Sequence, residues 1–355
     1  MLQKLVGGLL LSGLLIGQTT ANPQFSVVGD LIANDKKELS SSGVEIAVQG
    51  YVNPFARADV YLHKHNDESP VELEEAVLTI ERGLPFGLGL RLGKFRPDLG
   101  RINKVHTHLF PFIEAPTGMK KVLGEEFYAG TGLEANWLMP LPWYSNLSIG
   151  LFESGIESQS QKKDKEGEGH IIYTINDSDD EFYPEGLKDK EEGFDKVLTL
   201  RQSNFFDINE INHIEIGFSF YGDIKNSFGG VDFKYKWRPN KYRSLTIQGE
   251  IFQLSCWDGA SFGGNDYYNC AQASYLMSNF QFNKKYNIGI IADFWSFDLG
   301  KEAGTNQSIF IGFSPVEESS VLRLKIEQVD DGKDKHIRGV AQFIWSLGPH
   351  KPHRY

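Results

Sequence analysis

Basic side chains crowd one stretch of the sequence that begins at Arg91 and ends before Glu114. Charges in a narrow passage of low dielectric constant focus the electric field and concentrate ions of the opposite sign. If this stretch lines a narrow passage, its side chains would form a positive constriction that attracts anions. A loop held by salt bridges to the carboxylates of neighbouring strands is the alternative. The candidate constriction residues are Arg91, Lys94, Arg96, Arg101, Asn103 and Lys104.

The same stretch contains imidazole groups that could hold a metal ion. His106 and His108 flank a single residue, and Glu114 follows as a candidate oxygen ligand. His350 and His353, near the end of the chain, form a second candidate pair. A zinc site takes three or four protein ligands, so histidines that only donate hydrogen bonds remain the alternative. Zinc is the single candidate cofactor.

Signatures of catalysis are missing from the sequence. It contains no G-x-S-x-G, no H-E-x-x-H and no glycine-rich phosphate loop. Glu74 and Glu75 are adjacent, and neighbours on a regular strand point to opposite faces, so they would make a poor acid–base pair. A net charge of −11 argues against a nucleic-acid partner, which requires a basic surface. We therefore expect no enzymatic activity and no nucleic-acid binding.

The beginning of the chain has the features of an export signal. Lys4 precedes an apolar run over residues 5–17, and small residues end at Ala21. This order predicts a signal peptide over residues 1–21 and a single domain over 22–355. Cys256 and Cys270 are the only cysteines. In an exported protein such a pair predicts a disulfide that closes a loop, with two free thiols as the alternative.

Apolar and polar residues alternate along most of the remaining chain, as they do in strands that separate two environments. Val231 and Phe233, for example, share one face, and Asp232 and Lys234 share the other. A soluble β-sandwich would alternate in the same way, so the connections must distinguish the two folds. Short turns are predicted near 53–54, 83–85, 140–142, 207–209, 239–240, 283–285 and 315–318. Longer polar connections are predicted over 64–70, 96–127, 154–193, 222–227, 254–269, 298–305 and 330–335.

Short and long connections follow one another strictly, as in transmembrane barrels that have short periplasmic turns and long outer loops. Aromatic residues such as Trp143, Trp237 and Tyr286 lie beside the short turns, where an interfacial girdle is expected. The prediction is an all-β, closed antiparallel transmembrane barrel of about sixteen strands, with fourteen as the alternative. Residues 25–33 would supply the sixteenth strand and close the barrel against the last. Loop 96–127 is a candidate to fold back into the lumen.

Three segments resemble a known family. They are Asn22-Pro23 with Ser26-Val27-Val28-Gly29-Asp30, the block G-K-F-R-x-x-L-G-R-x-N-x-x-H-x-H-x-x-P-F at 93–112, and G-P-H-x-x-H at 348–353. Together they are similar to a family of bacterial outer-membrane porin-like barrels often labelled "zinc-regulated TonB-dependent outer membrane receptor". Leu99 and Glu114 stand where that family has Phe and Asp. The resemblance implies an outer-membrane barrel with a transport role.

The receptor part of that label conflicts with chain length. A TonB-dependent receptor has about 22 strands around a plug domain. At about ten residues per strand, this chain is long enough for about sixteen strands and leaves no residues for a plug. We therefore expect a porin-like channel of the bacterial outer membrane for passive or weakly selective uptake of small solutes, with anions or metal complexes as permeants. A receptor that binds zinc or a metal chelate is one alternative, and a structural barrel without transport is another. The expected partners are outer-membrane lipid, the permeant, and the assembly machinery that would recognise the terminal Tyr355.

Overall fold

The computed structural model describes residues 23–65, 70–153, 155–156, 196–223, 227–254, 271–297, 302–316 and 319–348. Several predicted features lie outside these ranges. They are the signal peptide, nearly all of loop 154–193, Cys256, Cys270, His350, His353 and Tyr355. The predictions made for these features stay predictions.

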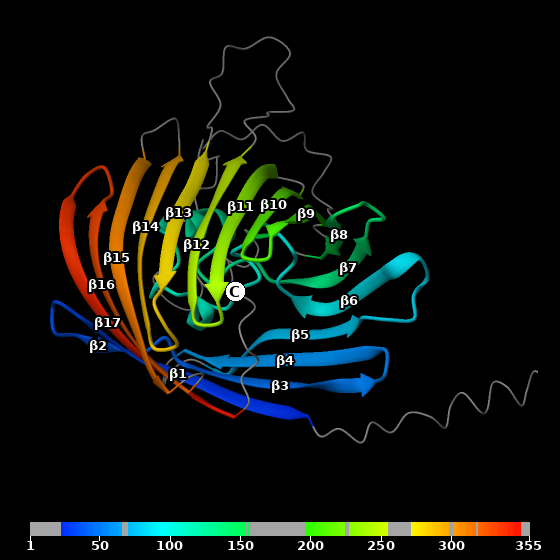
Figure 1. Cartoon of the computed structure of the whole chain (residues 1–355), viewed down its shortest axis with the longest axis horizontal. Helices are drawn as coiled ribbons and strands as arrows, with labels where there is room; N and C mark the ends of the chain where they lie inside the picture. The colour runs from blue at the N-terminus through cyan, green and yellow to red at the C-terminus, as the bar shows by residue number, and fades with distance from the viewer. Residues whose placement is uncertain are drawn as a thin grey trace, which may run out of the picture.

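The described residues form one sheet of antiparallel strands that closes on itself (Figure 1). Its strands are β1 (Gln24–Asn34), β2 (Leu39–Ser40), β3 (Val44–Asn53), β4 (Ala56–Lys64), β5 (Glu72–Ile80), β6 (Leu88–Phe95), β7 (Gly130–Leu138), β8 (Tyr144–Phe152), β9 (Val197–Asn209), β10 (Asn212–Gly222), β11 (Ser227–Asn240), β12 (Arg243–Leu254), β13 (Gln272–Gln281), β14 (Tyr286–Phe297), β15 (Glu302–Val316), β16 (Ser320–Asp330) and β17 (Lys335–Leu347).

β1 closes the barrel by pairing with β3 on one side and with β17 on the other. β2 has only two residues and lies beside β1, so sixteen of the seventeen strands form the closed wall. The sixteen-strand prediction is confirmed, and so is the role of residues 25–33 as the closing strand. Closure leaves no row of unpaired backbone groups at a sheet edge, which lipid would not tolerate.

The two faces of the wall differ as the alternation predicted. On β11, Val231 and Phe233 are exposed on the outside, whereas Asp232 and Lys234 are buried on the inside. Trp143, Tyr144, Tyr242 and Tyr286 are exposed beside the short turns. An apolar outer band bordered by aromatic residues is the surface that a barrel presents to lipid.

Several predicted connections overlap strands, and the turn predicted at 239–240 lies entirely within β11. β9 continues through the predicted turn at 207–209 and ends at Asn209, and β15 begins at Glu302 inside the predicted loop 298–305. The connection between β1 and β3, which carries β2, was not predicted. Backbone pairing with the neighbouring strand continues at the end of β9 and at the start of β15, although Asp, Asn and Glu there are residue types common in turns and loops.

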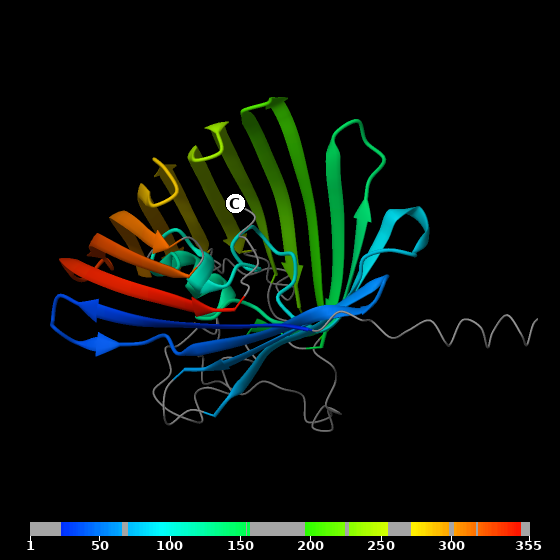
Figure 2. The same cartoon turned by 60° about the horizontal axis from the view of Figure 1, so that its bottom comes forward.

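The connection between β6 and β7, residues 96–129, folds into the barrel (Figure 2). We call it the inserted loop. It contains the 3₁₀ turn η2 (Thr107–Leu109) and the short helix α2 (Thr117–Leu123), while η1 (Pro85–Gly87) lies in the turn before β6. In the part of the chain described here, no helix is long and apolar enough to cross a bilayer.

Apolar side chains of the inserted loop form a core inside the barrel. Leu99, Ile102, Phe112 and Met119 are at most 1% exposed and belong to one buried cluster. Wall residues complete this cluster from the inner faces of many strands, namely Val77, Phe95, Phe152, Val197, Tyr221, Phe228, Phe252, Ala273, Tyr275, Met277, Trp295 and Phe310. The loop is therefore packed like a protein interior and is not a mobile flap.

Candidate functional site: the inserted loop and its contacts with the wall

The cationic residues at the start of the inserted loop lie next to wall carboxylates. Arg91, on the inner face of β6, lies 3.0 Å from Glu134 of β7. Lys94 belongs to the opposite face of β6, because the register of the β5–β6 pair puts it with Leu92 and Leu90, and its Nζ donates to the carbonyl of Leu73 at 2.6 Å. Arg91 therefore faces the lumen, whereas Lys94 does not.

Arg101 and Lys104 reach farther across the lumen. Arg101 lies 2.7 Å from Glu215 of β10 and 3.1 Å from Asp232 of β11. Lys104 lies 2.8 Å from Asp98 within the loop, and its side chain is 50% exposed. The charge of Arg101 is therefore neutralised by wall carboxylates, whereas half of the Lys104 side chain remains exposed in the lumen.

Arg96 and Asn103 hold the loop's own conformation. The Arg96 guanidinium is paired with Glu74 and also donates to the carbonyl of Val105 at 3.2 Å. The Asn103 side chain donates to the carbonyl of Tyr128 at 3.0 Å and accepts from its backbone N–H at 2.9 Å. Asn103 is fully buried, so it joins the two ends of the loop and does not line a pore.

Wall side chains also satisfy the loop's backbone. The Glu250 carboxylate of β12 accepts hydrogen bonds from the backbone N–H groups of Arg101 at 2.9 Å and Ile102 at 3.2 Å. The Glu134 carboxylate accepts a hydrogen bond from the backbone N–H of Asp98 at 2.8 Å. A buried N–H without an acceptor would destabilise the fold, so each contact stabilises the insertion.

Close approach to the wall requires a glycine at the turn of the loop. Gly100 has φ +61° and lies against Glu250 and Phe252. A Cβ atom there would overlap the Glu250 carboxylate. Only glycine combines this left-handed backbone with the available space.

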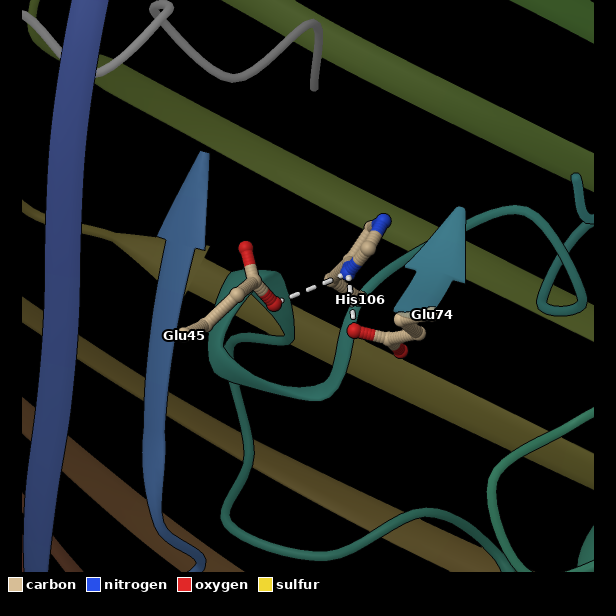
Figure 3. A group of neighbouring side chains, drawn as sticks. All are labelled: Glu45, Glu74 and His106. Carbon is tan, nitrogen blue, oxygen red and sulfur yellow. Dashed lines mark hydrogen bonds and ion pairs between the residues drawn. The ribbon is translucent and has the colours of Figure 1, made fainter. Parts of the chain in front are cut away.

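His106 lies in a buried group of carboxylates (Figure 3). Its Nδ1 is 3.0 Å from Glu45 of β3, and its Nε2 is 2.9 Å from Glu75 of β5. Glu74 lies 3.7 Å from Nδ1. Burial and the charge of Arg96 lower the pKa of His106, but Glu45 and Glu75 outweigh both and raise it from 6.5 to about 10. The ring is therefore an imidazolium that donates a hydrogen bond from each nitrogen.

Glu74 and Glu75 both face the lumen, contrary to the expectation for neighbours on a regular strand. The register between β4 and β5 shifts at Tyr61, so that Tyr61 is opposite Glu75 and Leu62 is opposite Leu73. Glu74 is the extra residue of this β-bulge, which turns both carboxylates toward the inserted loop. The bulge breaks the period of two, so the prediction that these two side chains point to opposite faces is wrong. The pair binds Arg96 and His106, which is a structural role.

Of the other candidate ligands that the structure describes, His108 lies near His106, whereas Glu114 lies apart from both. His108 Nδ1 lies 3.5 Å from Glu45, on the same side as His106. Glu114 lies instead on the far side of the loop, 2.5 Å from Lys325 of β16 and 2.7 Å from Arg338 of β17. Burial raises the pKa of Glu114, but Lys325 and Arg338 outweigh burial and lower it below its ordinary value. Glu114 is thus a partner of two cations.

A polar cavity of about 120 Å³ lies beside Glu114, between the loop and strands β14 to β17. Its polar lining includes Glu114, Asp293, Asn306, Ser308, Lys325 and Arg338. Asn306 Oδ1 and Ser308 Oγ are buried and, within the described residues, have no hydrogen-bond partner. Buried polar atoms of this kind normally have a partner, so the cavity suits water or a polar solute.

Sequence reasoning missed the wall partners of the loop and the apolar residues that anchor it. For Asp232, the alternation along its strand was a signal, because it put this residue on the polar face together with Lys234. Nothing in the sequence indicated which loop residue each carboxylate would bind, because the partners are distant along the chain.

Comparison with known proteins shows that this chain is similar to solved structures in its fold. No protein-family model matches the sequence. An uncharacterized protein of Aquifex aeolicus (strain VF5) is 28% identical over 226 residues, which cover 61% of this chain and 45% of that protein. The chain therefore spans less than half the length of this relative.

Solved structures resemble the whole barrel. OprB of Pseudomonas putida superposes with a TM-score of 0.58 at 11% identity, covering 96% of this chain and 97% of that one. The outer-membrane channel DcaP of Acinetobacter baumannii gives 0.56 at 9% identity, covering 93% and 99%. An anion-selective porin from Comamonas acidovorans gives 0.56 at 9% identity, covering 92% and 98%. The fold is that of outer-membrane porins.

Proposed function

We propose that this protein is a passive channel of the Gram-negative outer membrane for small polar solutes, with the inserted loop as its constriction. The observation that carries the proposal is the packing of residues 96–129 across the inside of a closed sixteen-strand barrel. An apolar outer band supports a position in lipid. The likeness to outer-membrane channels and porins supports the same role.

The charges of the constriction favour weak selectivity. Arg91, Arg96 and Arg101 are paired with wall carboxylates, so they present little net charge to a permeant. Lys104 is half exposed, and Lys234 and Lys236 line the inner face of β11 nearby. We therefore propose a modest preference for anions, which is weaker than that of an unpaired positive ring.

Two alternatives have less support. Capture of a metal by His106 and His108 would compete with the carboxylates that already face both nitrogens of His106. An energised receptor is expected to have about 22 strands, and this wall has sixteen.

Planar-bilayer recording tests the channel. We expect the purified wild type to insert with discrete conductance steps and to show a small reversal potential, of anionic sign, in a KCl gradient. A wild type that inserts but conducts no ions would overturn the proposal. A reversal potential of cationic sign would overturn the assigned selectivity.

A matched pair of variants tests where solutes pass. Ser308 faces the cavity, and its neighbour Ile309 faces outward at 45% exposure. If solutes pass along this side, Ser308→Trp should lower the conductance step by about half or more, because the new ring fills the cavity. Ile309→Trp should leave the step unchanged. Equal steps in the two variants would place the path elsewhere in the lumen.

A further inference from the structure

One imidazole and two carboxylates meet at the end of the barrel that carries the long connections. His65 directly follows β4, Glu72 is the first residue of β5, and Glu126 lies in the inserted loop shortly before β7. The Nε2 atom of His65 lies 3.1 Å from Glu126 and 3.9 Å from Glu72. One nitrogen or oxygen atom from each residue falls within 4.8 Å of the others.

These contacts leave the ring nitrogen of His65 unsatisfied. Nε2 is buried, and within the described residues it has no hydrogen bond, although Glu126 is close. A buried nitrogen that faces two carboxylates without a hydrogen bond is stabilised when a cation lies between the three groups. The side chains of His65, Glu72 and Glu126 are 26%, 43% and 39% exposed, so an ion can reach them from solvent.

The spacing suits a metal ion. Metal–nitrogen and metal–oxygen bonds of about 2.0–2.2 Å place tetrahedral ligand atoms about 3.4 Å apart. The two observed separations from Nε2, 3.1 and 3.9 Å, lie on either side of that value. All three ligand atoms lie within 4.8 Å of one another, so side-chain rotations would bring them to the tetrahedral spacing.

The donor set selects the class of ion. One imidazole with two carboxylates suits divalent transition metals, whereas Ca²⁺ and Mg²⁺ prefer oxygen ligands alone. The ring of His63 lies 4.1 Å from that of His65, between centroids, and is a candidate fourth ligand. We propose that His65, Glu72 and Glu126 bind a divalent transition-metal ion at the mouth of the barrel, with an open position for water.

The group around His106 is the less suitable of the two. There Arg96 pairs with Glu74, and the two nitrogens of His106 face Glu45 and Glu75, so the charges already compensate one another. A metal would have to displace both a proton and a guanidinium. At His65 no guanidinium contact is recorded among the described residues, Nε2 has no hydrogen bond there, and a metal would join the end of the inserted loop to the wall.

Binding of Co²⁺ to the folded protein in detergent tests the proposal, because the ion's visible absorption reports its ligands. We expect the wild type to bind Co²⁺ tightly, and His65→Gln and Glu126→Gln each to weaken binding by at least about tenfold. His336→Gln is the matched control, since His336 lies at the same end and 3.4 Å from Asp334. It should bind as the wild type does. Ca²⁺ should not compete at equal concentration.

The proposal does not depend on the channel function, and bilayer conductance need not change. Circular dichroism and heat-modifiable gel mobility establish that each variant is folded. Equal Co²⁺ affinity in wild type and in both folded variants would overturn the site. Loss of binding in His106→Gln but not in His65→Gln would overturn it in favour of the other cluster.

Discussion

The Nε2 atom of His106 lies 2.9 Å from Oε1 of Glu75, and the bulge in β5 helps to make this contact. The bulge turns Glu74 inward together with Glu75, so that one strand binds both Arg96 and His106. Glu45 of β3 holds the other nitrogen of the ring. The inserted loop is thereby tied to the wall at two strands.

Removing His106 should loosen this connection. In His106→Ala the buried carboxylates of Glu45 and Glu75 lose their cation, and the free energy of unfolding should fall by about 3 kcal/mol. Denaturant unfolding in detergent micelles measures the change. The control is His213→Ala, because His213 pairs with Asp207 at a site where the carboxylate is 68% exposed. An exposed pair contributes less than about 1 kcal/mol, so equal effects would contradict the buried role of His106.

The contribution of His106 to stability should depend on pH. Its pKa is about 10 when folded and 6.5 as an ordinary value, so the folded state holds the proton more tightly. The stabilisation is therefore complete below pH 6.5, declines as the pH rises, and is lost once the pH passes about 10. The difference in unfolding free energy between wild type and His106→Ala, measured from pH 6 to about pH 11, should shrink accordingly. A difference that grows with pH would contradict this assignment.

Gly100 should not tolerate a side chain. Gly100→Ala adds a Cβ that overlaps Glu250, and its left-handed φ of +61° adds strain. We expect a loss of about 3 kcal/mol or more, with disruption of the amide contacts to Glu250. Gly87→Ala is the matched control, because Gly87 also has a positive φ, +70°, but has open space around it. It should lose about 1 kcal/mol. Equal losses would show that backbone strain alone accounts for both.

A charged side chain introduced near the middle of the outer face of β16 should destabilise the barrel. Leu324 is 50% exposed on that face, and Leu324→Arg should destabilise the barrel in lipid by about 2–4 kcal/mol. Gln328→Arg, on the same face but close to the strand end at Asp330, should cost at most about 1 kcal/mol. Unfolding in lipid vesicles gives both values. A Leu324→Arg variant as stable as wild type would show that this face does not contact the hydrocarbon.

Alternation of side chains and the order of short and long connections were sufficient to determine the barrel. They gave about sixteen strands, with fourteen as the alternative, and closure through residues 25–33, because a period of two directly assigns each residue to one face. The sequence also singled out Arg101, as a constriction residue or a salt-bridge partner, and His106, as a metal ligand or a hydrogen-bond donor, without indicating the contacts of either.

Only the tertiary structure decided those partners. Two side chains meet in the lumen only if they lie at the same level along the barrel axis. That level depends on the strand register around the whole wall, on the bulge at Glu74 and on the path of the loop through its apolar core. Because of these features, Glu114 lies beside Lys325 and His65 lies beside Glu126, although the two residues of each pair are far apart in sequence. Local patterns cannot contain this information, because it comes from packing between distant segments.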